Sequence, residues 1–143
     1  MSIRAARPED LSEVVGLLDR LGLPVDGVPS HLERFLVLEI GGRILGAVGL
    51  ELYGRRALLR SLSVAAVQQG RGHGRHLCRE ILARARALGI EEIVLLTETA
   101  APFFEREEFE TIARHEVDET VRASEQFRFS CPQSAACMHL RLP

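Results

Sequence analysis

The sequence has no lysine, few cysteines and no long apolar stretch, and each absence excludes a class of protein. All 18 positions counted as lysine or arginine are arginine, so the Gly-Lys-Ser/Thr segment of a Walker nucleotide loop is absent. Three cysteines are an odd number, which argues against a disulfide framework. No stretch reaches the roughly 18 apolar residues that a membrane-spanning helix needs.

The N-terminal sequence and the charge favour an ordinary cytoplasmic protein. Met1–Ala5 contains no apolar run after a charged segment, so we expect no signal peptide. A net charge of -2 gives no reason to expect nucleic-acid binding. Several arginines still gather between positions 71 and 86. They form either a solvated helix face or a local attraction for a phosphate-bearing ligand.

The length of 143 residues predicts one domain covering residues 1–143. Hydrophobic periodicity gives the order β-α-α-β-β-β-α-β-α-β-β. We therefore expect an α/β (α+β) fold, a mixed central sheet of about six or seven strands with helices on both faces. The expected strands are 2–5, 35–40, 43–53, 56–64, 92–97, 111–117 and 136–142, and the expected helices are 8–21, 30–34, 72–88 and 100–106.

Turn signals support this order in the middle of the chain. Gly41-Gly42 predicts a hairpin, so the three strands between 35 and 64 form an antiparallel meander. Ser30 is a plausible N-cap for the short helix that follows it. The segment 118–134 has no clean period and is interpreted as a helical turn plus an ordered loop.

The strongest local signal is a strand followed by alternating glycines and a helix. Gly70, Gly72 and Gly74 lie between the strand at 56–64 and the helix at 72–88. Exposed N–H groups at a helix N-terminus bind anions, and glycines let the backbone approach them closely. The pattern predicts a pyrophosphate site, although the glycines alone also fit a flexible turn.

A Rossmann dinucleotide fingerprint is an alternative interpretation of the same loop. That fingerprint needs an acid roughly 20 residues later, and Glu91 and Glu92 lie near that distance. However, the strand before the loop ends an antiparallel meander, which disfavours a doubly wound domain.

Three stretches together resemble the GNAT acetyltransferases. Gln69-Gly70-Arg71-Gly72-His73-Gly74 is similar to their Gln/Arg-x-x-Gly-x-Gly/Ala signature, and Ser61-Leu62-Ser63-Val64 resembles their fourth strand. Residues 101–109 resemble their Ala-x-x-Phe-Tyr-x-x-x-Gly-Phe element. The resemblance covers nearly the whole chain and implies a single GNAT acetyltransferase domain.

This resemblance implies that acetyl-CoA is the cosubstrate. Backbone groups of Leu62 and Val64 would pair with the pantetheine arm, and amides of residues 70–75 would hold the pyrophosphate. The strands 57–64 and 92–97 would splay apart to admit the thioester. The expected cofactor-binding residues are Leu62, Ser63, Val64, Gln69, Gly70, Arg71, Gly72, His73, Gly74, Arg75, Phe103 and Phe104.

Two further resemblances are narrower. Residues 59–64 and 95–104 look like the acetyltransferase domain of N-acetylglutamate synthases. Residues 121–138 are similar to a branch of arsenic-resistance N-acetyltransferases. These resemblances imply a small-molecule acceptor, an amino acid or an amino-acid-like toxin, and GNAT domains often pair as homodimers.

The resemblance breaks at two positions. Phe104 stands where the family usually carries a tyrosine that protonates the leaving thiolate, and Glu108 stands where it usually carries glycine. A positioned acid contributes roughly 10²- to 10⁴-fold in rate, although a thiol pKa of about 8.5 makes thiolate a tolerable leaving group. A non-catalytic acyl-CoA-binding or sensing module therefore stays open, as does a protein N-terminal or lysine acetyltransferase.

Two residues are candidates for the chemistry of acetyl transfer. Glu98 follows a central strand, where open sheets bind ligands, and is the candidate general base. The alternative interpretation is that Glu98 is an acid at a helix N-terminus, where the helix dipole favours a negative charge. A backbone N–H at Ser63 or Val64 is the candidate donor to the thioester oxygen, which gains charge during attack.

The acceptor has its own candidates. Arg60 lies four residues before Val64, about 13 Å along a strand, and can grip a carboxylate with two parallel hydrogen bonds. An exposed strand arginine is the alternative interpretation. The other substrate-binding candidates are Thr97, Thr99, Arg122 and Arg128. Cys131, Cys137 and His139 match no common zinc spacing, so we expect no metal.

Overall fold

The computed structural model describes the chain except residue 131 and the side chains of residues 129 and 130. Seven strands form one mixed sheet in the order β1-β2-β3-β4-β5-β7-β6. This confirms the expected α/β class and sheet. The strands are β1 Ser2–Ala5, β2 Phe35–Ile40, β3 Arg43–Tyr53, β4 Arg56–Val64, β5 Glu92–Thr97, β6 Glu110–Thr111 and β7 Ala136–Arg141.

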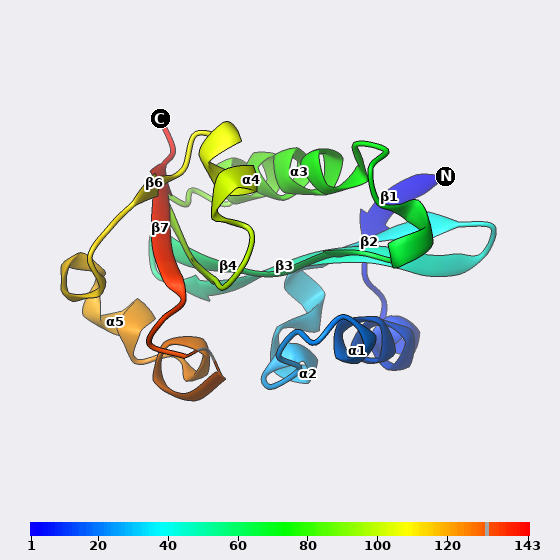
Figure 1. Cartoon of the computed structure of the whole chain (residues 1–143), viewed down its shortest axis with the longest axis horizontal. Helices are drawn as coiled ribbons and strands as arrows, with labels where there is room; N and C mark the ends of the chain where they lie inside the picture. Colours follow the sequence, from blue (N-terminus) through cyan, green and yellow to red (C-terminus); the bar gives the residue numbers. More distant parts are fainter. Residues whose placement is uncertain (131) are drawn as a thin grey trace.

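Helices cover both faces of the sheet (Figure 1). On one face lie α3 (His73–Ala87) and α4 (Ala101–Arg106), and on the other lie α1 (Leu11–Arg20), α2 (Val28–His31) and α5 (Glu119–Arg122). Short 3-10 turns precede α1, follow α2 and precede α3, and a π-helical segment Gln126–Ser130 follows α5.

The alternation of side chains along the strands builds a core on each face. In β2, Leu36 and Leu38 pack in the cluster under α3, whereas Val37 packs in the cluster under α1. Successive strand side chains point to opposite faces, so a strand that is apolar at every position requires both layers of helices. The spacing of Leu77 and Ile81 completes the α3 side.

Two sequence predictions of local structure are wrong. The short helix begins at Val28, and its N-cap is Gly27 with φ +81°, not Ser30. The strand expected at 111–117 is only the pair Glu110–Thr111. Beyond it a 3-10 turn at Arg114–Glu116 forms, and the Arg114 guanidinium donates hydrogen bonds to the carbonyl oxygens of Pro132 and Ala135.

Candidate functional site

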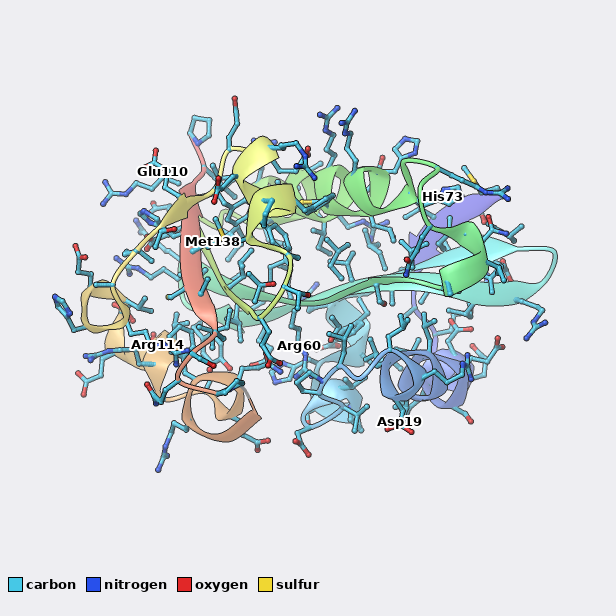
Figure 2. All side chains as sticks on the ribbon, viewed as in Figure 1. Asp19, Arg60, His73, Glu110, Arg114 and Met138 are labelled. Atoms are coloured by element: carbon cyan, nitrogen blue, oxygen red, sulfur yellow. The ribbon has the colours of Figure 1, made fainter. Side chains whose placement is uncertain are left out.

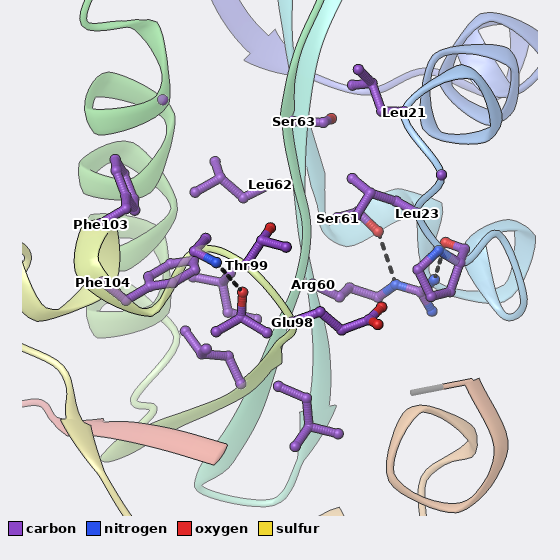
Figure 3. A pocket seen from close by; sticks show the side chains of 18 of the residues that line it. Leu21, Leu23, Arg60, Ser61, Leu62, Ser63, Glu98, Thr99, Phe103 and Phe104 are labelled. Atoms are coloured by element: carbon purple, nitrogen blue, oxygen red, sulfur yellow. Dashed lines mark hydrogen bonds between the residues drawn. The ribbon is translucent and has the colours of Figure 1, made fainter. Parts of the chain in front are cut away.

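A cavity lies where β4 and β5 separate. The two strands pair in parallel through three positions, the last joining Leu58 to Val94. Beyond that pair lies a cavity of about 660 Å³, shown in Figure 3. The expected splay of these strands is thus present. The cavity is lined by residues 59–64 of β4, residues 95–100 at the end of β5, residues 21–24, and Gln69, Gly74, Phe103, Phe104 and Gln126.

A bulge bends β4 where it leaves β5. The register between β3 and β4 shifts between Ala47 and Gly49, and Ser61 takes φ +63°. Left-handed backbone costs a non-glycine residue free energy and is concentrated at functional sites. A bulge increases local twist and bends the strand that carries it, so it directs residues 61–64 along the cavity.

The hydrogen-bond ladder settles which backbone groups of β4 face the cavity. The N–H of Ala65 donates to the carbonyl of Leu45, and Ser63 lies opposite Ala47. Hydrogen-bonded pairs alternate in an antiparallel ladder, so Ser63 directs its N–H toward β3 and Val64 directs its groups outward. Consistent with this, the Gln69 side-chain amide donates to the Val64 carbonyl over 2.9 Å.

The glycine loop forms the N-terminus of α3. Gly70 and Gly72 have φ near +80°, and a Cβ at either position would meet no atom within 4 Å. The first N–H groups of a helix have no intrahelical partner. In the described chain, no hydrogen bond from another segment uses the amides of residues 70–75. His73 lies at this end of the helix (Figure 2). A helix N-terminus with such amides is suited to an anion.

The polar residues after β5 reach the cavity. Glu98 and Thr99 are exposed and line it. Thr97 also lines it, but its hydroxyl oxygen accepts a hydrogen bond from the N–H of Ala100 over 3.0 Å, which fixes the start of α4. Glu98 therefore has a carboxylate at the cavity wall, as a general base requires.

Two phenylalanines of α4 form the apolar part of the wall. The rings of Phe103 and Phe104 lie 5.1 Å apart in an edge-to-face arrangement, and Phe104 meets Phe109 in the same way at 5.4 Å. Phe104 is buried. Its ring supplies packing at the position where the resemblance implied a phenol.

Arg60 is buried at the back of the cavity, so the interpretation as an exposed strand arginine is wrong. Its side chain is 1% exposed and its Nη1 lies 2.7 Å from Oε2 of Glu51. Nη1 also donates to the Asp26 carbonyl, Nη2 to the Pro24 carbonyl and Nε to the Ser61 hydroxyl. Direct binding of an acceptor carboxylate by Arg60 stays a prediction.

The remaining substrate candidates lie elsewhere. Arg122 and Arg128 are exposed and are not among the residues that line the cavity. Sequence reasoning missed the wall at residues 21–24, the cavity-facing Gln126 and the pairing of Glu51 with Arg60. A carboxylate inside the apolar strand β3 was the available signal, because buried charges are almost always paired.

Glu51 also accepts a hydrogen bond from the Tyr53 hydroxyl. Burial first, and then this carboxylate, raise the pKa of Tyr53, so the phenol remains a donor at neutral pH. His31 lies next to the same carboxylate, with Nε2 3.8 Å from Oε1. Glu51 therefore joins residues from β3, β4 and α2.

Among the described residues, no three His, Cys, Asp or Glu side chains gather in a way that could hold a metal ion. Cys137 is buried in β7, and Cys131 lies outside the described residues. Within the same limits, none of the helices has the length and apolarity to cross a bilayer.

The sheet splits between β4 and β5, and the N-terminus of α3 lies at the mouth of the split. This arrangement has the geometry that an extended, phosphate-bearing ligand requires. Residues 31–111 match the family described as the acetyltransferase (GNAT) domain. This match covers more than half of the chain, and the chain belongs to the GNAT acetyltransferase family. The expected membership of this family is confirmed, and a single domain over residues 1–143 stays a prediction.

Relatives in sequence are named amino-acid acetyltransferases. A protein of that name from Neisseria meningitidis is 26% identical over 131 residues, covering 85% of this chain and 30% of the relative. One from Ralstonia nicotianae is 32% identical over 111 residues, covering 71% of this chain and 25% of the relative. The chain thus spans less than a third of the length of these relatives.

Solved structures share the fold. N-acetylglutamate synthase from Neisseria gonorrhoeae, complexed with coenzyme A and N-acetyl-glutamate, superposes with a TM-score of 0.85 at 24% identity, over 99% of this chain and 35% of that one. Rv2747 from Mycobacterium tuberculosis, in complex with CoA and NLQ, gives 0.82 at 22% identity and full coverage of both chains.

Proposed function

We propose that this chain is an acetyl-CoA-dependent N-acetyltransferase that acts on the amino group of an amino acid or an amino-acid-like compound. The observation that carries the proposal is the cavity between the separated ends of β4 and β5. It extends from Gln69 and Gly74 at the glycine loop to Glu98 beyond β5. The names of the relatives support an amino-acid acceptor.

The residues present fit acetyl-CoA. Open glycines and helix amides at residues 70–75 suit a pyrophosphate, and the outward-facing backbone of Val64 suits an amide-bearing arm laid beside β4. The Gln69 side chain donates one hydrogen bond to that Val64 carbonyl, and the second lone pair of the oxygen can accept another from an amide of the arm.

The reaction has one bond formed and one broken. Bound acetyl-CoA supplies a thioester carbonyl carbon, which gains a C–N bond to the amine and loses its C–S bond to CoA. Glu98 takes the proton that the attacking nitrogen loses, and water protonates the leaving thiolate. The Val64 N–H donates to the thioester oxygen, since Ser63 uses its own N–H toward β3. The attacking nitrogen must be neutral, so the ammonium form of the α-amino group loses a proton before it attacks.

A turnover assay tests this proposal. Incubation with acetyl-CoA and a panel of amino acids releases free CoA, and Glu98→Gln lowers kcat by about 10²-fold or more while CoA binding persists. Glu105→Gln, on the exposed side of α4, is the matched control and leaves kcat unchanged. If no amino acid caused release of CoA, the proposal of an amino-acid acceptor would be wrong. If Glu98→Gln left kcat unchanged, Glu98 would not be the general base.

The narrower acceptor class is the amino-acid-like toxin of the arsenic-resistance branch, which the resemblance of residues 121–138 supports. Including such a compound in the panel tests it: faster CoA release than with any protein amino acid would favour that branch. A homodimer is a further proposal, for which the mass in solution is the test.

One observation favours a second function. Because Phe104 offers no phenol beside the leaving thiolate, a non-catalytic acyl-CoA-binding module is the alternative. Tight CoA binding without turnover on amino acids, peptides or lysine side chains would select it.

A further inference from the structure

The segment between α1 and α2 forms one wall of the cavity, and a buried arginine holds it from behind. Leu21, Gly22, Leu23 and Pro24 line the cavity, and Figure 3 shows Arg60 extending from β4 toward this segment. Two of the Arg60 hydrogen bonds go to carbonyls of the segment, at 2.6 Å to Asp26 and 3.2 Å to Pro24.

The charge of Arg60 is balanced inside the protein. Glu51 pairs with it at 2.7 Å, and the two side chains are 4% and 1% exposed. Buried ion pairs keep their charge only when the remaining donors and acceptors are also satisfied. Here the hydroxyls of Ser61 and Tyr53 and the two segment carbonyls complete the set.

We infer that Arg60 is a positioning residue, which sets the shape of the acceptor side of the cavity by fixing residues 21–27 through their carbonyl groups. This inference rests on the proposed function and specifies how that site recognises its acceptor. The position of Arg60 also explains why residue 27 is a glycine. A Cβ at this left-handed glycine would lie 3.1 Å from Nη1 of Arg60 and 3.7 Å from Oε2 of Glu51.

Positioning of the wall and direct contact with the substrate predict different effects of substitutions at and around Arg60. A positioning role predicts that disturbing Arg60 weakens every amine that fills the cavity, whether or not the amine carries a carboxylate. Direct contact predicts a loss confined to carboxylated amines. Direct contact also predicts that Glu51→Gln, which removes the competing carboxylate, leaves acceptor binding intact or improves it.

The experiment uses Arg60→Lys, Glu51→Gln and Gly27→Ala, with Gly89→Ala as the control. Gly89 has the same φ of +81° as Gly27 but nothing within 4 Å of its Cβ position, so it carries the same backbone cost without touching Arg60. Lysine retains the charge but cannot reproduce the planar fork of donors. KM and kcat are measured with L-glutamate and with its diamide at saturating acetyl-CoA.

The expected result is that all three variants raise KM about tenfold, for L-glutamate and the diamide alike. This is a loss of about 1.4 kcal/mol. The Kd for CoA and the KM values of Gly89→Ala stay within twofold of wild type. A KM increase confined to L-glutamate, or unchanged KM values in Gly27→Ala and Glu51→Gln, would overturn the inference.

Hydrogen exchange decides the inference even if the wild type acetylates neither amine, an outcome that would count only against the proposed function. The amides of residues 21–27 other than Pro24 exchange faster in Arg60→Lys and Glu51→Gln than in wild type, while those of α3 do not change. Equal exchange in this segment would show that Arg60 does not hold it.

Discussion

Two residues other than glycine have left-handed backbone conformations, which the amino-acid sequence alone does not predict. In the described chain these residues are Ser61, with φ +63°, and Glu108, with φ +74°. Ser61 lies at the bulge that bends β4 along the cavity. Glu108 lies two residues beyond the end of α4, at the position where the GNAT element that residues 101–109 resemble has glycine. The departure from the family pattern therefore imposes strain at Glu108.

Replacing Glu108 with glycine stabilises the protein. The substitution removes roughly 1–2 kcal/mol of left-handed strain, and the greater freedom of glycine in the unfolded chain offsets about 1 kcal/mol. We expect the free energy of unfolding to rise by about 0.5 kcal/mol in urea titrations.

Glu105→Gly is the matched control for this prediction, because Glu105 is also exposed and lies within α4. Glycine inside a helix costs about 1 kcal/mol, so the control is less stable than wild type. Two destabilised variants would show that Glu108 is not strained.

At the scale of elements, an ion pair joins β1 to the turn before α1. Nη1 and Nη2 of Arg4 donate to the two carboxylate oxygens of Asp10 at 2.8 and 3.1 Å, and the N–H of Arg7 donates to the same carboxylate at 2.7 Å. The hydrogen bonds from Arg4 lower the pKa of Asp10 below its ordinary value, with a smaller contribution from Arg7.

This pKa shift determines how the free energy of unfolding changes as the pH falls. The folded pKa lies below the unfolded value of about 3.9, so the stabilisation is present above that value and is lost as the pH falls through the folded pKa. We expect Asp10→Asn to lower the free energy of unfolding by about 2 kcal/mol at pH 7, and by progressively less below pH 4.

Asp19 is an exposed acid on α1, so Asp19→Asn is the control for the charge change. In this control the free energy of unfolding falls with pH at acidic pH as it does in wild type. Parallel curves for wild type and Asp10→Asn between pH 7 and pH 3 would contradict the prediction.

Local periodicity predicted most elements because their apolar faces are continuous in sequence. The strands at 35–40, 43–53, 56–64 and 92–97 have the predicted bounds. The expected strand at 111–117 failed because Arg114 reaches carbonyls of the distant segment before β7, a tertiary contact that no local pattern encodes. The glycine loop before α3 was also predictable, because its glycines are close together in the sequence.

The acceptor side of the cavity was harder to predict than the cofactor side. Glu98 follows the end of a strand, which the sequence indicates. The wall at 21–24 and its anchor Arg60 come together only because β4 lies beneath the connection between α1 and α2. The pairing of Glu51 with Arg60 is diagonal across two strands: Glu51 lies opposite Leu58, two residues from Arg60. Its detection requires the register as well as the sequence.

At the scale of the whole molecule, one sheet separates two apolar layers that each bury a cysteine. Cys78 lies in the cluster between the sheet and α3, and Cys137 lies in the cluster with Val121 on the opposite face. Burial is the main cause that raises the pKa of Cys78 to about 12 and that of Cys137 to about 11. Thiolate is the reactive form, so each thiol reports on the opening of its own layer.

Both thiols should therefore react with iodoacetamide at pH 8 only when their layers open. If the layers open together in global unfolding, the stability of an ordinary domain makes each reaction at least about 10³-fold slower than that of a free thiol peptide. Mass spectrometry of peptides measures the two rates separately, and the rates converge in denaturing urea, which is the control for intrinsic reactivity. Rapid labelling of Cys137 beside a protected Cys78 would contradict joint opening, because the layer around α5 would then open while the layer under α3 stays closed.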